Sequence, residues 1–170
     1  MHTRVVMGID PGLQHCGWGV ISLRGNHTSF QACGRITSEA GQDLADRLLF
    51  IFEALKVVLT AHKPDEVAVE QTFVSRDAVA SLKLGHARAM ALIAPRICGL
   101  PVFEYAPNKV KKSVVGVGHA DKIQVQHMIR LLLPGAEFRS PDEADALAIA
   151  LCHAHHQPQA RNPLAQGEVL

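Results

Sequence analysis

Short apolar runs separated by turn residues occupy the first part of the chain. Residues 4–10 (RVVMGID) predict a core strand, because nearly every position is apolar. Residues 16–23 and about 29–37 have the composition of two further strands, and Gly25-Asn26 between them is typical of a tight hairpin turn. The pattern therefore predicts a three-stranded meander at the N-terminus.

Longer segments with helical periodicity follow the meander. Leu, Ile, Phe and Val recur every three to four positions over 42–62, which predicts an amphipathic helix before an apolar strand at 66–70. Residues 76–98 predict a second helix, which is rich in Ala and Gly and so permits close approach of a neighbouring element or a partner. A short strand is expected at 101–105.

Three more helices complete the pattern, at about 107–114, 120–133 and 141–156. The order β-β-β-α-β-α-β-α-α-α predicts an α/β fold with a mixed sheet and helices on both faces. Residues 157–170 contain Pro and Gly and few large apolar side chains, so we expect a flexible C-terminal tail. The remaining residues, 1–156, are expected to form one domain.

The composition is that of a globular protein whose charges are unevenly distributed. The chain has 170 residues, 48% of them hydrophobic, and a formal net charge of +1. Residues 108–130 carry five Lys and Arg against one Asp, whereas 137–145 carry four Asp and Glu against one Arg. A basic stretch beside an acidic one suits a phosphodiester-cleaving site, although two solvated faces of opposite charge would give the same pattern.

The four cysteines and the hydropathy profile argue for a reducing compartment. Cys16, Cys33, Cys98 and Cys152 form no C-x-x-C pair, and their spacing suggests no disulfide framework. No signal peptide is recognisable, and no apolar run is long enough to span a bilayer. We therefore expect a cytoplasmic protein.

Carboxylates stand at the ends of elements that are otherwise apolar. Asp10 ends the first strand, Glu70 ends the strand at 66–70, and Asp145 enters the apolar part of the last helix. Asp142 shares a helix face with Asp145, because the two are three residues apart. Strand ends gather at one edge of an α/β sheet, so the four could form one acidic site. An all-oxygen set favours Mg²⁺ or Mn²⁺ over zinc.

Each carboxylate also has an ordinary structural explanation. Asp10 precedes Pro-Gly and suits a turn, and Glu70 could simply reach solvent from a strand end. Ser140 is a natural helix N-cap, and Ser140-x-x-Glu143 matches a capping box, which accounts for Glu143. The capping box does not account for Asp145, which lies beyond the first turn.

Two other motifs carry less weight. Cys152, His153, His155 and His156 look like metal ligands, but consecutive residues of one helix cannot all converge on one ion. Gly116-x-Gly118 precedes a helix without a strand leading into it, so a dinucleotide site is not expected.

Seven motifs follow one another over nearly all of 4–156. They are Met7-Gly-Ile-Asp10-Pro-Gly12, Val69-Glu70-Gln71, Leu82-Lys-Leu-Gly85-x-Ala-Arg88, Val102-Phe-Glu-Tyr105, Val114-Val-Gly-x-Gly118, Lys122 with Gln124-Val-Gln-His-Met128, and Asp142-x-x-Asp145-Ala-Leu-Ala148. Taken in order, they resemble the RuvC family of bacterial Holliday-junction resolvases. The resemblance implies a ribonuclease H-like fold with a five-stranded mixed sheet. It also implies a homodimeric endonuclease that nicks two strands of like polarity across a four-way DNA junction.

The resemblance extends to individual residues and partners. Asp10, Glu70, Asp142 and Asp145 match the family's catalytic and metal-binding acids, with Mg²⁺ (or Mn²⁺), two ions per site, as cofactor. Lys111 and Lys122 match basic residues of the active site, and Phe73 matches an aromatic that contacts bases near the crossover. Lys109 and Lys112 are expected to position the DNA backbone. The implied partners are the branch-migration proteins RuvA and RuvB.

Three alternatives remain for the sequence. An actin-like nucleotide-binding domain also begins with a strand ending in G-I-D-x-G, but that class needs two lobes and gives Asp142 and Asp145 no role. A protein of this fold could bind branched DNA without cutting it. A related nuclease could act on another nucleic acid as a monomer, and the small-residue helix at 78–94 would distinguish it: a two-fold interface there favours paired nicking.

Overall fold

The computed structural model describes residues 3–72 and 76–156. Its ten elements are β1 Arg4–Asp10, β2 His15–Arg24, β3 His27–Thr37, α1 Leu44–His62, β4 Glu66–Glu70, α2 Ala78–Ile97, β5 Val102–Tyr105, α3 Pro107–Val115, α4 Lys122–Leu132 and α5 Pro141–His156. The predicted order of elements is confirmed. Ends differ by a few residues, as at β3, which begins at His27 because the hairpin turns tightly at Gly25 with a φ of 60°.

The five strands form one mixed sheet in the order β3-β2-β1-β4-β5. β1 pairs antiparallel with β2, and β2 with β3, which gives the predicted meander. β1 pairs parallel with β4, and β4 with β5, through the crossover helices α1 and α2. β1 is therefore the central strand, and its carboxyl end lies beside that of β4.

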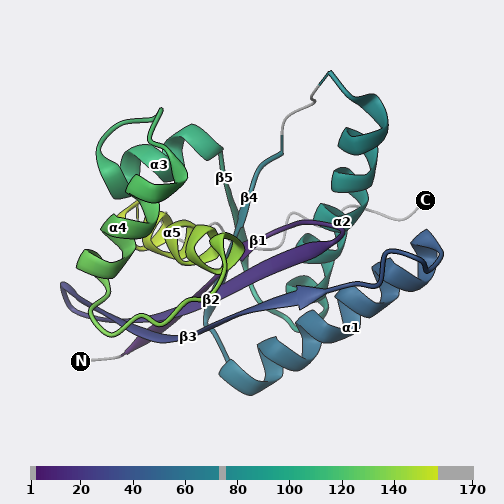
Figure 1. Ribbon diagram of the computed structural model, residues 1–170. Helices are drawn as coiled ribbons and strands as arrows, with labels where there is room; N and C mark the ends of the chain where they lie inside the picture. The colour runs from purple at the N-terminus through teal and green to yellow at the C-terminus, as the bar shows by residue number, and fades with distance from the viewer. Residues whose placement is uncertain (1–2, 73–75, 157–170) are drawn as a thin grey trace, which may run out of the picture.

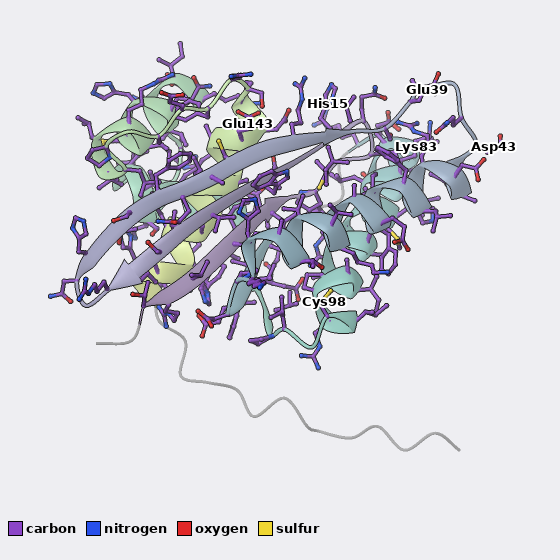
Figure 2. The ribbon with its side chains drawn as sticks, turned by 90° about the horizontal axis from the view of Figure 1, so that it is seen from below. His15, Glu39, Asp43, Lys83, Cys98 and Glu143 are labelled. Atoms are coloured by element: carbon purple, nitrogen blue, oxygen red, sulfur yellow. The ribbon has the colours of Figure 1, made fainter. Side chains whose placement is uncertain are left out.

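Helices cover both faces of the sheet (Figure 1). α1 and α2 pack together on one face against Met7 and Ile9 of β1, and Figure 2 shows the same pair side by side in a second view. α3, α4 and α5 cover the other face, where Val6 of β1 belongs to their core cluster. Alternate residues of β1 thus face two separate cores, which explains why its sequence is apolar almost throughout.

Helix α5 is the most deeply buried element, and its burial fixes its position on the sheet. Its residues Ala144 and Ala146–Ala154 are all buried. At its far end the ring of His153 is fully buried and bonds the hydroxyl of Tyr105 and the carboxylate of Glu66, both at 2.8 Å. None of the helices in the described part of the chain is long and apolar enough to cross a bilayer.

Candidate active site

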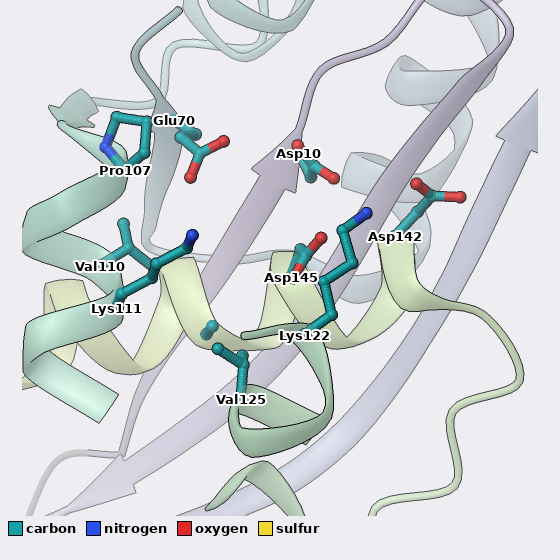
Figure 3. Close-up of a pocket in the computed structure, with 10 residues that line it drawn as sticks. Asp10, Glu70, Pro107, Val110, Lys111, Lys122, Val125, Asp142 and Asp145 are labelled. Carbon is teal, nitrogen blue, oxygen red and sulfur yellow. The ribbon is translucent and has the colours of Figure 1, made fainter. Parts of the chain in front are cut away.

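One pocket collects side chains from five elements that are far apart in the sequence. Its ten lining residues come from the ends of β1 and β4, from α3 and α4, and from α5. Six of them are charged: Asp10, Glu70, Lys111, Lys122, Asp142 and Asp145. Figure 3 shows the four carboxylates around the mouth of the pocket, with the two lysine side chains reaching toward them from α3 and α4. The structure thus brings together all four acids and both lysines that the sequence singles out.

The parallel pairing of β1 and β4 places the first two acids. The last residues in register between these strands are Ile9 and Val69. Asp10 and Glu70 each follow directly, so both emerge where the ladder ends. A carboxylate one residue earlier would be buried among the core side chains, whereas here the oxygens reach the pocket. The site therefore lies at the carboxyl edge of the sheet, as expected for α/β folds.

Two glycines let α5 approach the sheet closely enough to place the other two acids. A Cβ built on Gly8 would lie 2.0 Å from the carbonyl oxygen of Ala146, and one built on Gly17 would lie 2.1 Å from that of Asp142. Neither position can hold a side chain unless α5 moves away from β1 and β2. The backbone of Asp142 therefore sits directly on the sheet, beside the strand that ends in Asp10.

Glu143 serves the start of α5 rather than the pocket. The Ser140 hydroxyl accepts from the backbone N–H of Glu143 at 3.3 Å, as the capping box predicts. The return bond is different: the Glu143 carboxylate accepts from the N–H of Arg139 at 2.5 Å, one residue before the predicted partner. The thiol of Cys33 also lies 3.9 Å from this carboxylate. Glu143 is not among the pocket-lining residues.

The electrostatics of the pocket oppose ionisation of Asp10. Burial, and then the charges of Glu70, Asp145 and Asp142, raise the pKa of Asp10 from 3.8 to about 8, against an opposing effect of Lys122. A carboxyl group in this state is held protonated near neutral pH unless a cation enters the pocket.

The neighbouring acids are perturbed in the same direction. Burial and the charge of Asp145 raise the pKa of Glu70 from 4.5 to about 7, and Lys111 opposes this shift. Burial also raises the pKa of Asp145. Clusters of carboxyl groups with raised pKa values are typical of functional sites, because a bound cation would stabilise their ionised forms. Within residues 3–72 and 76–156, no three acidic, His or Cys side chains are already arranged to ligate one ion.

The basic residues separate into two groups. Lys111 and Lys122 line the pocket, and each lowers the pKa of an acid in it. Lys109 and Lys112 also lie on α3 but are exposed and do not line the pocket. The ammonium of Lys109 lies 5.2 Å from the centre of the Tyr105 ring, a cation–π contact. These two lysines therefore lie outside the pocket.

Arg35 is a residue of the site that the sequence analysis missed. It lies on β3, and its guanidinium is 3.7 Å from the carboxylate of Asp142. Arg35 is in register with Gly17 on β2, the residue beneath Asp142, which explains the proximity. Such a contact between distant segments has no local sequence signal. Phe73, predicted to contact DNA, lies outside the described residues.

The two motifs given little weight have structural roles. Both ring nitrogens of His153 are engaged by Tyr105 and Glu66 inside the core. Gly116 ends α3 in the left-handed conformation, with a φ of 89°, and its N–H bonds the carbonyl of Lys112. This glycine is a helix C-cap.

A five-stranded mixed sheet of this order, with an acidic pocket at the ends of β1 and β4, defines a nuclease of the ribonuclease H-like class. The match to a family model is more specific: residues 6–153 match the model described as crossover junction endodeoxyribonuclease RuvC. The chain belongs to the RuvC family. It is accordingly an endonuclease that resolves four-way (Holliday) DNA junctions in recombination and repair, and the expectations of fold and activity are confirmed.

Individual relatives agree with this assignment. The chain is 54% identical to the RuvC of Agrobacterium fabrum over 95% of its own length and 96% of the relative's. It is 56% identical to that of Rhizobium etli over 92% of both chains. The structure of Thermus thermophilus RuvC in complex with a Holliday junction substrate superposes with a TM-score of 0.84 at 36% identity, covering 91% of this chain and 94% of that one.

Proposed function

We propose that Asp10, Glu70, Asp142 and Asp145 are the catalytic residues and hold the divalent metal that the reaction requires. The observation that carries this proposal is the shared pocket, in which burial and mutual repulsion raise the pKa of Asp10 to about 8. Mg²⁺ fits the set, because all the donors are carboxylate oxygens and no pocket residue is His or Cys. Mn²⁺ prefers the same donors.

Asp10, Glu70, Asp142 and Asp145 would together hold the metal, which we propose to be two ions in each site. The chemistry that bound metal would supply is activation of a water molecule and stabilisation of the leaving oxygen. The protein's own contribution is to fix the acids on rigid elements: two at strand ends and two on the buried helix α5. The backbone positions of the acids are thereby fixed, and binding of the metal would require only the carboxylate side chains to turn toward it.

The lysines of the pocket would bind the scissile phosphate. Lys122 stands at the first position of α4, where its side chain reaches toward Asp10 and Asp142 (Figure 3). Lys111 approaches from the opposite wall, near Glu70. Their charges would stabilise the extra negative charge on the phosphate in the transition state. Val110 and Val125 give the same pocket apolar walls beside these lysines.

Contacts outside the pocket would position the rest of the junction. The exposed Lys109 and Lys112 suit the DNA backbone, where each contact adds affinity without sequence selectivity. Phe73 is proposed to stack on bases near the crossover, as the family resemblance implies.

Two copies of the chain would act together through α2. This helix exposes Leu82, Ile93 and Ile97 to the extent of 63%, 45% and 61%, an apolar stripe with helical spacing. Gly85 lies among them with nothing within 4 Å of a Cβ placed there, so the fold of one chain does not require glycine at this point. A second α2 packed across a two-fold axis would use both features. The dimer would present two pockets to two strands of like polarity, which gives symmetric nicking.

The wider setting follows from the same family resemblance. The enzyme would work in the cytoplasm with RuvA and RuvB, which supply branch migration. Residues 1–156 would form the nuclease domain, and the C-terminal tail predicted at 157–170 lies outside the described residues.

The test is cleavage of a synthetic four-way junction with Mg²⁺, with EDTA, and by the variants Asp10→Asn and Glu70→Gln. We expect paired, symmetric nicks that require the metal and are lost in both variants, while the exposed-site variant Asp43→Asn cuts normally. Junction binding without cutting in either Mg²⁺ or Mn²⁺ would support a structural binder instead. Equal cutting of linear duplex would remove the junction selectivity, and normal cutting by Asp10→Asn would contradict the assigned site.

A further inference from the structure

Arg88 connects the middle of α2 to the strand end that carries Glu70. Its Nε donates a hydrogen bond to the backbone carbonyl of Glu70 at 3.3 Å. Its Nη2 forms an ion pair with the carboxylate of Glu104 on β5. The side chain is only 23% exposed, so both contacts lie largely out of solvent. One guanidinium therefore holds the ends of two neighbouring strands.

The Glu70 peptide needs such a partner because the sheet gives it support on one side only. The ladder between β1 and β4 ends at Ile9 and Val69, one residue before Glu70. On the other side, the N–H of Gln71 bonds the carbonyl of Tyr105 on β5. The carbonyl of Glu70 accepts from Arg88 in place of a strand partner, which prevents the end of β4 from fraying.

The guanidinium is itself held in a defined orientation. Glu104 is in register with Val69, so the carboxylate that binds Arg88 stands one residue before Glu70 and Tyr105, the pair that ends the β4–β5 ladder. A planar guanidinium can donate to a carboxylate and a carbonyl at the same time in fixed directions, whereas an ammonium group cannot impose that geometry.

The contact between Arg88 and Glu70 is made to the backbone and not to the carboxylate. Burial and the charge of Asp145 raise the pKa of the Glu70 carboxyl, and Lys111 opposes the shift. The Arg88 contact is with the main chain, while the carboxylate of Glu70 faces the pocket on the other side of the residue. We propose that Arg88 is a positioning residue, which fixes the backbone of Glu70 so that its carboxylate stays directed at the metal site; this inference rests on the proposed function of that site.

In the proposed dimer, Arg88 would also connect the site to the partner subunit. Successive residues of a helix are about 100° apart around its axis. Arg88 therefore projects about 140° away from Ile93 and about 180° away from Val79, and both of these residues are exposed. A partner chain on the exposed stripe would hold α2 from outside, and α2 would hold Glu70 through Arg88. Dimer formation and the geometry of the metal site would thus be connected by one side chain.

The test compares Arg88→Ala and Arg88→Lys with the control Arg96→Ala in the full-length protein. Arg96 is a matched control because it lies on the same helix and also donates to a carbonyl, that of Leu100 at 3.2 Å, away from the pocket. Hydrogen exchange of the peptide covering 66–72 reports on the backbone, and calorimetric titration with Mn²⁺ reports on the site. Junction binding in EDTA and single-turnover cleavage complete the measurements.

We expect exchange in 66–72 to be about fivefold faster in Arg88→Ala, and the Mn²⁺ concentration at half-saturation to rise about tenfold, as for loss of one charge-assisted hydrogen bond. Arg88→Lys should recover less than half of each effect, and junction binding in EDTA should not change. Unchanged exchange and Mn²⁺ affinity would overturn the proposal, as would a loss of junction binding with unchanged exchange, which would make Arg88 a DNA contact. If the unaltered protein binds no Mn²⁺, the proposed metal site fails, and the exchange data still decide whether Arg88 holds Glu70.

Discussion

Asp10→Asn is expected to stabilise the metal-free protein even though it removes the central acid of the site. In the folded chain the pKa of Asp10 is raised from 3.8 to about 8, so the folded state keeps a proton that the unfolded chain releases. Stability therefore falls as the pH rises from about 4 to about 8, and the loss is complete above that range. Asparagine has nearly the same shape and carries no charge, so it avoids this loss.

The size of the effect follows from the same pKa values. The interval between 3.8 and about 8 corresponds to an upper limit of about 6 kcal/mol at about 1.4 kcal/mol for each pH unit. Water that enters the pocket reduces both the desolvation cost, which is the larger cause of the shift, and the repulsion, so we expect about 2 kcal/mol at pH 8. For a chain of this length, that raises the midpoint of thermal unfolding by about 4–8 °C.

The assay is thermal unfolding in EDTA at pH 5, 6.5 and 8, followed by the same series in Mg²⁺. The advantage of Asp10→Asn should grow with pH in EDTA and shrink when Mg²⁺ neutralises the acids of the unaltered protein. Asp43→Asn is the matched control, because Asp43 is exposed beside α1 and lies far from α5 in Figure 2. The reasoning is refuted if Asp10→Asn is no more stable than Asp43→Asn at pH 8 in EDTA.

Three further predictions test the surroundings of the site. Gly17→Ala should lower the free energy of unfolding by about 2–3 kcal/mol and slow junction cleavage, because the new Cβ would meet the carbonyl of Asp142 at 2.1 Å. Urea denaturation measures the first effect and single-turnover kinetics the second, and a normal cleavage rate would contradict the close packing. Lys122→Ala should reduce the cleavage rate about 100-fold with little change in junction affinity. Lys112→Ala should instead change only the junction affinity and the salt dependence of that affinity, and the opposite result would exchange the roles of the two lysines. Leu82→Glu should give a monomer in sedimentation experiments, and an intact dimer would place the interface elsewhere.

The hydrophobic pattern predicted the fold well because each element carries its own signal. Strands β1 and β4 are apolar on both faces, and α1 shows clear helical spacing. The acids were also recognisable from local context, since Asp10 and Glu70 end apolar strands and Asp145 enters a buried helix. Their proximity then follows from the parallel pairing of β1 with β4, which the crossover through α1 predicts.

Contacts between distant segments could not be predicted in the same way. Arg35 meets Asp142, and Arg88 meets the carbonyl of Glu70, and neither pair has a spacing that a helix or strand would impose. In the sequence, Gly17 has no feature that distinguishes it from other strand residues, because its role depends on the backbone of α5, which packs directly over it. The capping box at Ser140 was predicted, but the Glu143 carboxylate accepts from the backbone N–H of Arg139 instead of that of Ser140.

The repulsion among the acids is sustained by packing elsewhere in the fold. Asp142 and Asp145 would move away from Asp10 if α5 were free to shift along the sheet. The far end of α5 is held by the buried His153, and side chains such as Leu147 and Leu151 are fully or almost fully buried. Burial of each leucine contributes about 1.5–3 kcal/mol, so a few of them offset the unfavourable charge in the pocket. An increase in stability on removing the Asp10 charge and a loss of stability on separating α5 from the sheet therefore have one cause: the acids are held together by contacts that they do not make themselves.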